Sequence, residues 1–313
     1  MIINQSMMSR VLFLGAMVAG SFAAPTAQAA LFDSNDLLVA EFNNQQISIY
    51  DENFAFKGVF AGGVGQILTL DFTPGGNVVT TNRSSQIREY DPNGGLVGTY
   101  SNSTSNPFDV KTGADGRIYT GNQAGTVREF NPDGTAPGRS FGSANNFGAV
   151  AVLPGNKLWI SGSAVGNIRV IDLATGAQTD TLAWDGGQNN ADSMRYNVET
   201  NTVLISSANS ATIWERDLSG TLLRTFTPGV AISSFYGNVD RGPNGEVWMP
   251  SFEGASLLRW SASGDFLGTT ALPGSSGPFG VLWTGGAHVP EPSAMMALAA
   301  AIGVCLRRRR RMH

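Results

Sequence analysis

Short apolar stretches that end in Asp, Asn or Ser recur along the chain at nearly equal intervals, and a glycine-containing turn follows each one. Runs of four or five such residues bounded by turn signals are typical of β-strands. Successive stretches end 40, 40, 41, 45 and 44 residues apart. A period in this range predicts a propeller or a solenoid. The closing positions are Asp51, Asp91, Asn131, Asp172, Asp217 and Ser261.

The turns themselves explain why Asp and Asn recur. In Asp91-Pro92-Asn93-Gly94 the first side chain can accept hydrogen bonds from backbone N–H groups two residues further on. Proline presets the next φ, and glycine takes the left-handed position that returns the chain as a hairpin. These aspartates are therefore expected to be structural rather than metal ligands.

Two further apolar segments precede each turn, and one follows it, which gives four strands per period. The first repeat lacks its first strand, because it begins near Leu37. The missing piece follows the sixth repeat as Pro278–Trp283, which resembles Pro107–Val110 of the third repeat. The sequence therefore predicts an all-β, six-bladed propeller closed by this terminal strand, which we call the clasp. Five or seven blades are the alternatives. In its repeat period and in the residue pattern of its strands, the body resembles the NHL and streptogramin-lyase-like propellers.

The two ends of the chain have a different character from the repeats. Residues 1–29 are typical of a secretory signal peptide, with Arg10 before an apolar run over 11–24. A small-x-small cleavage pattern follows at Ala27 and Ala29, so the mature chain is expected to begin near Ala30. The alternative is a buried N-terminal helix.

The segment 289–313 combines three parts in order: a Pro-Glu-Pro triplet, 14 uncharged residues and a basic block. A helix of 14 residues spans only about 21 Å, short of the roughly 30 Å hydrocarbon core. The basic block resists translocation and is expected to stay in the cytoplasm. The triplet is Pro290, Glu291 and Pro292, and the block is Arg307, Arg308, Arg309, Arg310 and Arg311.

This layout closely resembles the PEP-CTERM sorting signal of Gram-negative bacteria. The resemblance implies that an exosortase, a membrane protease-transpeptidase, recognises Pro290, Glu291 and Pro292 and removes the tail. It also implies transient anchoring in the inner membrane, then transfer to the cell surface or an extracellular matrix associated with exopolysaccharide. A plain membrane anchor is the alternative interpretation.

Composition narrows the function of the body, taken as residues 30–288. The stretch 30–289 holds 14 Lys and Arg against 23 Asp and Glu, a net charge of −9, which opposes nucleic-acid binding. Cys305 is the only cysteine, so no intramolecular disulfide forms. The two histidines, His288 and His313, lie outside the predicted ring. Because the lyases of the resembling group depend on histidine, the body is not expected to share their chemistry.

One catalytic alternative stays open, in which side-chain oxygen atoms bind a calcium ion. Calcium-dependent propellers use Asp, Asn and Glu oxygens, and several such residues fall on first strands of the repeats. They form a candidate site for a ligand or cation at the mouth of the central channel, with no catalytic role assigned. The candidate residues are Asp109, Asp192, Arg195, Asn238 and Asp240.

Two functions follow from these observations. Asn-, Ser-, Gly- and Gln-rich segments are expected to line one mouth of the channel, between blades and between second and third strands. Such a rim suits a non-catalytic propeller that binds a glycan or protein without a cofactor, although short loops favour these residues in any case. The alternative is a calcium-dependent hydrolase or lyase acting on small secreted substrates.

Overall fold

The computed structural model describes residues 30–101, 106–122, 125–135, 138–143, 148–162, 166–184, 191–207, 211–229 and 237–285. The predicted signal peptide and sorting segment lie outside these residues. Among the residues described, no helix is both long and apolar enough to cross a membrane.

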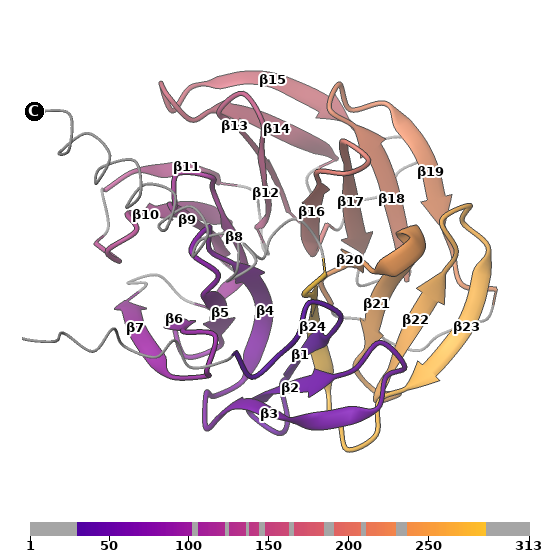
Figure 1. The fold of residues 1–313 in the computed structure, drawn as a ribbon. Coiled ribbons are helices and arrows are strands. Elements are labelled where there is room, and N and C mark those ends of the chain that lie inside the picture. Colours follow the sequence, from indigo (N-terminus) through magenta and orange to yellow (C-terminus); the bar gives the residue numbers. More distant parts are fainter. Residues whose placement is uncertain are drawn as a thin grey trace, which may run out of the picture.

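Within the described residues, 24 strands form six four-stranded antiparallel sheets that are arranged around a common axis as blades (Figure 1). The six-bladed propeller is therefore confirmed. Blade 1 consists of β24 (Pro278–Trp283), β1 (Leu37–Glu41), β2 (Gln46–Tyr50) and β3 (Phe56–Gly62). Blade 2 consists of β4 (Ile67–Phe72), β5 (Val78–Asn82), β6 (Gln86–Tyr90) and β7 (Leu96–Ser101). Blade 3 consists of β8 (Pro107–Thr112), β9 (Ile118–Asn122), β10 (Thr126–Phe130) and β11 (Ser140–Ser143).

The other three blades repeat this order from the axis outward. Blade 4 consists of β12 (Ala149–Leu153), β13 (Lys157–Ser161), β14 (Asn167–Asp172) and β15 (Gln178–Ala183). Blade 5 consists of β16 (Ser193–Asn197), β17 (Thr202–Ser207), β18 (Thr212–Asp217) and β19 (Leu222–Phe226). Blade 6 consists of β20 (Asp240–Arg241), β21 (Val247–Ser251), β22 (Ser256–Trp260) and β23 (Phe266–Ala271), with a 3-10 turn, η1 (Pro243–Gly245), after β20.

The clasp closes the ring as the sequence predicts. β24 pairs antiparallel with β1, so that Leu37 lies opposite Trp283 and Leu38 lies opposite Leu282. In Figure 1 the yellow end of the chain lies against the indigo beginning. This pairing gives blade 1 its innermost strand, and without it β1 would expose an unpaired edge.

The hairpin turns form as expected from their composition. The carboxylate of Asp91 accepts the backbone N–H groups of Asn93 (2.8 Å) and Gly95 (2.9 Å), and the Gly94 N–H donates to the Asp91 carbonyl. Gly94 has φ of +75°, and a Cβ there would lie 2.0 Å from the Phe60 carbonyl oxygen. Only glycine fits this position, because both the backbone angle and the close approach exclude a side chain.

Apolar side chains on both faces of each blade pack against the neighbouring blades. Middle strands such as β1 and β17 are buried along their whole length, whereas the outermost strand β15 is almost entirely exposed. Four tryptophans are among the largest fully buried side chains, namely Trp159, Trp214, Trp248 and Trp260. The core is therefore distributed around the ring, between the blades.

Candidate functional site

The innermost strands of the six blades place two rings of residues around the axis. In blades 1 to 5 the residue between the two rings lies opposite an equivalent second-strand residue. In blade 6, Asp240 lies opposite Trp248, as Ala151 lies opposite Trp159 in blade 4. The first axial ring is Thr69, Asp109, Ala149, Ser193, Asn238 and Gly280. The second axial ring, two residues further along each strand, is Asp71, Lys111, Ala151, Arg195, Asp240 and Leu282.

Polar members of these rings connect blade 2 to blade 3, blade 3 to blade 4 and blade 6 to blade 1. The innermost strand is the edge of its sheet, so some of its N–H groups need partners outside the sheet. Side chains of the preceding blade supply the acceptors. The bonds run from Val110 N to Thr69 Oγ1 (3.1 Å), Thr112 N to Asp71 Oδ2 (2.8 Å), Val150 N to Asp109 Oδ2 (3.1 Å), Val281 N to Asn238 Oδ1 (2.8 Å) and Trp283 N to Asp240 Oδ2 (2.7 Å).

Asp109 also reaches the blade beyond its neighbour. Ala149 has no side-chain acceptor for blade 5, and Asp109 Oδ2 accepts the Met194 N–H at 3.4 Å. The Ser193 hydroxyl donates to Asp109 Oδ1 at 3.3 Å, and Lys111 Nζ forms an ion pair with the same oxygen. Asp109 is fully buried. Burial raises the pKa of its carboxyl, and the nearby Lys111 ammonium partly offsets this effect.

Arg195 holds blade 5 to blades 2 and 6 across the axis. Its Nη1 donates to Asp71 Oδ1 at 2.7 Å, its Nη2 donates to the Leu70 carbonyl at 3.3 Å, and its Nε lies 3.4 Å from Asp240 Oδ1. All three charged side chains are at least 90% buried. Burial opposes the charged guanidinium, but Asp240 and Asp71 outweigh it and raise the pKa of Arg195. We call Asp71, Asp109, Lys111, Arg195 and Asp240 the axial charge cluster.

Four of the five predicted site residues therefore meet at the axis, namely Asp109, Arg195, Asn238 and Asp240. Asp192 is buried just before β16, and its N–H donates to the Ser206 carbonyl at 2.9 Å. Sequence reasoning missed Asp71 and Lys111, although both share the register of Arg195 and Asp240 within the repeat. A binding role for the five predicted residues stays a prediction.

The axial carboxylates have few oxygens to offer a cation. Both oxygens of Asp71 accept hydrogen bonds, from Arg195 and from Thr112. Asp240 binds the Trp283 N–H with one oxygen and faces Arg195 with the other. Among the residues described, no group of three or more His, Cys, Asp and Glu could hold a metal ion. A calcium ion between Asp71 and Asp240 would meet the Arg195 guanidinium, so these residues do not fit it.

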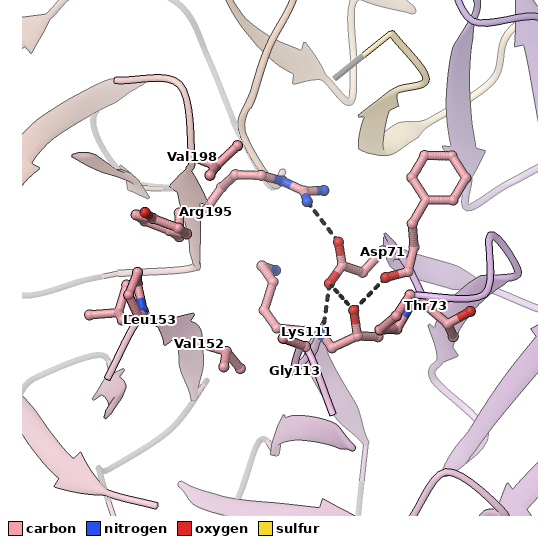
Figure 2. Close-up of a pocket in the computed structure, with 14 residues that line it drawn as sticks. Asp71, Thr73, Lys111, Gly113, Val152, Leu153, Arg195 and Val198 are labelled. Atoms are coloured by element: carbon pink, nitrogen blue, oxygen red, sulfur yellow. Dashed lines mark hydrogen bonds and ion pairs between the residues drawn. The ribbon is translucent and has the colours of Figure 1, made fainter. Parts of the chain in front are cut away.

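Three members of the axial charge cluster form the floor of a pocket of about 550 Å³ (Figure 2). Lys111, Arg195 and Asp71 lie at the bottom, whereas Val152, Leu153 and other aliphatic residues form the walls. The remaining lining residues are Phe72, Thr73, Pro74, Thr112, Gly113, Ala114, Pro154, Tyr196 and Val198. We call this the axial pocket.

Turns between first and second strands surround the axial pocket. From the sequence, the ligand was instead expected at a channel mouth lined by two kinds of segment: those that join blades and those that join second to third strands. Several of these segments fall outside the described residues, at 102–105, 144–147, 185–190 and 208–210. The concave surface among the described residues therefore belongs to turns that the sequence did not single out as a binding site. Their signal is modest, a Pro-Gly, Asp-Gly or Asn-Gly pair after the first strands of blades 2, 3, 4 and 6.

Two further hollows adjoin the axial pocket. One of about 770 Å³ lies between blades 3 and 4 and shares Gly113, Ala114 and the segment 152–154 with the axial pocket. Another of about 180 Å³ shares Val198 and is lined by Trp283 and Gly285 at the end of the clasp.

The opposite end of the innermost strands carries a cluster of aromatic side chains. Phe108 and Phe279 are buried, and their ring centroids lie 5.6 Å apart. Phe42 packs on Phe279 and Phe252 at 6.2 and 5.7 Å. Together with Leu68 they form one apolar cluster from blades 1, 2, 3 and 6, which we call the phenylalanine cluster.

Comparison with known proteins gives one motif and one fold. Residues 288–311 match the PEP-CTERM protein-sorting motif. A Bacteroides caccae protein of unknown function is 12% identical, with a TM-score of 0.60 over 79% of this chain and 97% of that chain. A streptogramin B lyase is 15% identical, with a TM-score of 0.61 over 80% of this chain and 84% of that chain. No curated protein sequence matches the chain. The chain thus carries a PEP-CTERM sorting motif that is C-terminal to a six-bladed β-propeller, whose fold is similar to that of streptogramin B lyase.

Proposed function

We propose that this exported protein is displayed at the cell surface or in the extracellular matrix, where its propeller binds a glycan or a protein in the axial pocket without transforming it. An exosortase removes the C-terminal segment at Pro290, Glu291 and Pro292. The sorting motif supports the export and processing, and the axial pocket supports the binding. A pocket of about 550 Å³ is within the range of ligand sites.

The observation that carries this proposal is the pairing of every charged side chain on the pocket floor. Asp71, Lys111 and Arg195 are each at least 90% buried and engaged with an opposite charge. General acid–base catalysis needs a group that exchanges protons with the substrate near neutral pH. Groups fixed in buried ion pairs are suited to holding the shape of the pocket, and its aliphatic walls are suited to excluding water around a ligand.

Filling the pocket should abolish this binding. Ala114 is exposed and lines both the axial pocket and the adjoining hollow, so Ala114→Trp should weaken retention of extracellular matrix material at least tenfold. The measurement uses full-length protein in detergent micelles, immobilised and exposed to matrix extract from the producing culture. Ala55→Trp, in an exposed turn of blade 1, is the matched control and should bind like the wild type.

Two outcomes of that experiment would contradict the proposal. Equal retention by Ala114→Trp and the wild type would remove the axial pocket from the function. Cleaved ligand, detected by mass spectrometry and accumulating with many turnovers per protein molecule, would show the hydrolase or lyase alternative.

The sorting step has its own test. Replacing Pro290, Glu291 and Pro292 with alanine should leave the protein exported but unprocessed, with over 90% of it in the inner membrane. Replacing the five arginines 307–311 with asparagine should instead weaken the cytoplasmic stop, because the charges that resist translocation are gone. Fractionation and intact-mass measurement distinguish the variants. A mature wild-type protein that still carries Arg307–Arg311 in a host with an exosortase would show that the tail is a plain anchor.

A further inference from the structure

We infer that the signal peptide must be removed before blade 1 closes, because the folded body shields the bond at which it is cut. From the sequence, this bond joins Ala29 to Ala30. The inference concerns an earlier proteolytic step than the sorting at Pro290, and it does not depend on what the axial pocket binds. It therefore goes beyond the proposed function.

The chain is fixed to the body almost directly after the predicted cut. The Leu31 N–H donates to the carbonyl of Pro92, in a turn of blade 2, at 3.0 Å. Phe32 is only 5% exposed, and its ring centroid lies 5.6 Å from that of Phe60 and 5.7 Å from that of Phe72. The third residue after the cut is thus part of the core that blades 1 and 2 share.

Polar contacts tie the same segment to the end of the clasp. Lys57 Nζ forms ion pairs with Asp33 and Asp36, at 2.9 and 2.6 Å. The Asp36 N–H donates to Thr284 Oγ1 at 2.8 Å, and the Thr284 N–H donates to the Asp36 carbonyl at 3.0 Å. Asp36 is buried, and its hydrogen bond with Lys57 raises the pKa of that lysine. We call Phe32, Asp33, Asp36, Lys57 and Thr284 the terminal latch.

In the folded protein the cut lies too close to the body for a peptidase to enclose it. One extended residue spans at most about 3.6 Å, so the Ala30 nitrogen of the scissile bond lies within about 4 Å of the bonded Leu31 nitrogen. Ala30 itself is half-buried. A peptidase has to surround the scissile bond with its active-site cleft, and two folded surfaces cannot meet this closely around one backbone bond. Cleavage of a folded precursor therefore requires Leu31 and Phe32 to leave the body first.

The C-terminal cut has a longer reach. Gly285 packs so closely on Ser34 that a Cβ there would lie 2.4 Å from the Ser34 carbonyl oxygen. Residues 286–289 separate Gly285 from Pro290, whereas Ala30 alone separates the predicted N-terminal cut from Leu31. The proposed sorting cut can therefore follow folding, but removal of the signal peptide has to precede it.

The order of the chain leaves time for this sequence of events. Thr284 lies 248 residues beyond Asp36, its partner in the latch. Blade 1 also lacks its innermost strand until Pro278–Trp283 has arrived. A chain that is exported from its N-terminal end thus presents the site long before the terminal latch can close.

Cleavage of folded precursors by purified signal peptidase tests the inference. The full-length precursor, with its signal peptide intact, is folded in detergent micelles, and release of the signal peptide is followed by intact-mass measurement. A Gly-Ser-Gly-Ser-Gly-Ser spacer between Ala30 and Leu31 moves the scissile bond away from the body and leaves the latch unchanged. We expect this spacer variant to be cleaved at least tenfold faster than the folded wild type.

Two controls isolate the effect of distance. The same spacer between Ala287 and His288 should leave signal-peptide release as slow as in the wild type. Synthetic peptides of residues 15–40, with and without the N-terminal spacer, should be cleaved at equal rates, which shows that the spacer does not improve the site itself. Equal cleavage of the folded wild type and the N-terminal spacer variant would overturn the inference.

A pair of point variants assigns the shielding to the latch. Phe32→Ala should raise the cleavage rate of the folded precursor at least fivefold, because it weakens the packing of the segment after the cut. Phe141→Ala removes a phenylalanine of blade 3 that is equally buried, at 4% exposed, and should leave the rate unchanged. Thermal melts show that both precursors are folded. Equal acceleration in the two variants would mean that the site opens by global unfolding, which would overturn the role of the latch.

Pulse-labelling in the producing cells tests the order of events directly. The cleaved chain should appear before a core that resists added protease. An uncleaved, protease-resistant chain that is later converted into the mature protein would overturn the inference. A mature chain that begins well before Ala30 would overturn it too, because the bond would then lie clear of the body.

Discussion

Deleting the clasp, Pro278–Trp283, is expected to lower the melting temperature by more than about 10 °C or to prevent folding altogether. The four large apolar side chains of β24, Phe279, Val281, Leu282 and Trp283, are buried. Each contributes roughly 1.5–3 kcal/mol by burial, and about 1 kcal/mol corresponds to 2–4 °C in a protein of this size. The deletion also exposes an edge of β1. Thermal melts followed by circular dichroism measure the effect.

A point substitution keeps this prediction testable if the deletion variant fails to fold. Leu282→Ala removes a fully buried side chain and should lower the free energy of unfolding by about 2–5 kcal/mol. Leu267→Ala is the control on the outermost strand of the neighbouring blade, where the leucine is 51% exposed, and it should change stability by less than about 1 kcal/mol. Similar values for the two variants would show that β24 does not hold the ring closed.

Arg195→Met is expected to destabilise the protein by about 3–5 kcal/mol at pH 7. The substitution leaves Asp71 and Asp240 buried without their shared cation, and an unpaired buried charge is costly. Urea denaturation of the variant and the wild type measures the effect.

Two controls separate the lost ion pair from simple loss of packing. Arg224→Met removes a guanidinium that is 37% exposed and 4.0 Å from Glu215, so it should cost less than about 1 kcal/mol. Adding Asp71→Asn to Arg195→Met should recover part of the stability, because the amide oxygen still accepts the Thr112 N–H without a charge. A deficit in Arg195→Met that Asp71→Asn does not relieve would contradict the ion-pair argument.

The repeat, the turns and the clasp could all be predicted because their signals are local. A turn such as Asp91–Gly95 contains its own donors and acceptors, and the period of these turns counts the blades. The clasp could be found because one strand is missing at the start and one similar strand is left over at the end.

Asp109, Arg195 and Asp240 of the axial charge cluster were among the predicted site residues, but the ion pairs that the cluster forms could not be predicted in the same way. Arg195 and Asp71 lie 124 residues apart, and they meet only because the ring closes around a common axis. Asp109 and Asn238 stand out in the sequence as polar residues in apolar strands, which is equally the pattern of a ligand site. Their bonds to Val150 and Val281 depend on the free edge of the next blade, and a strand pattern does not reveal which edge is free.

The end of the clasp has a consequence for the geometry of sorting. Gly285 lies in the small hollow that adjoins the axial pocket, and only residues 286–289 separate it from Pro290. Five fully extended steps span at most about 18 Å. An exosortase that acts at Pro290 would therefore work within that distance of the face that carries the axial pocket. If the proposed processing takes place, this face stays tethered towards the membrane until the tail is cut, and the phenylalanine cluster points away from the membrane. Proteolytic release would then also determine when a ligand in the outside medium gains access.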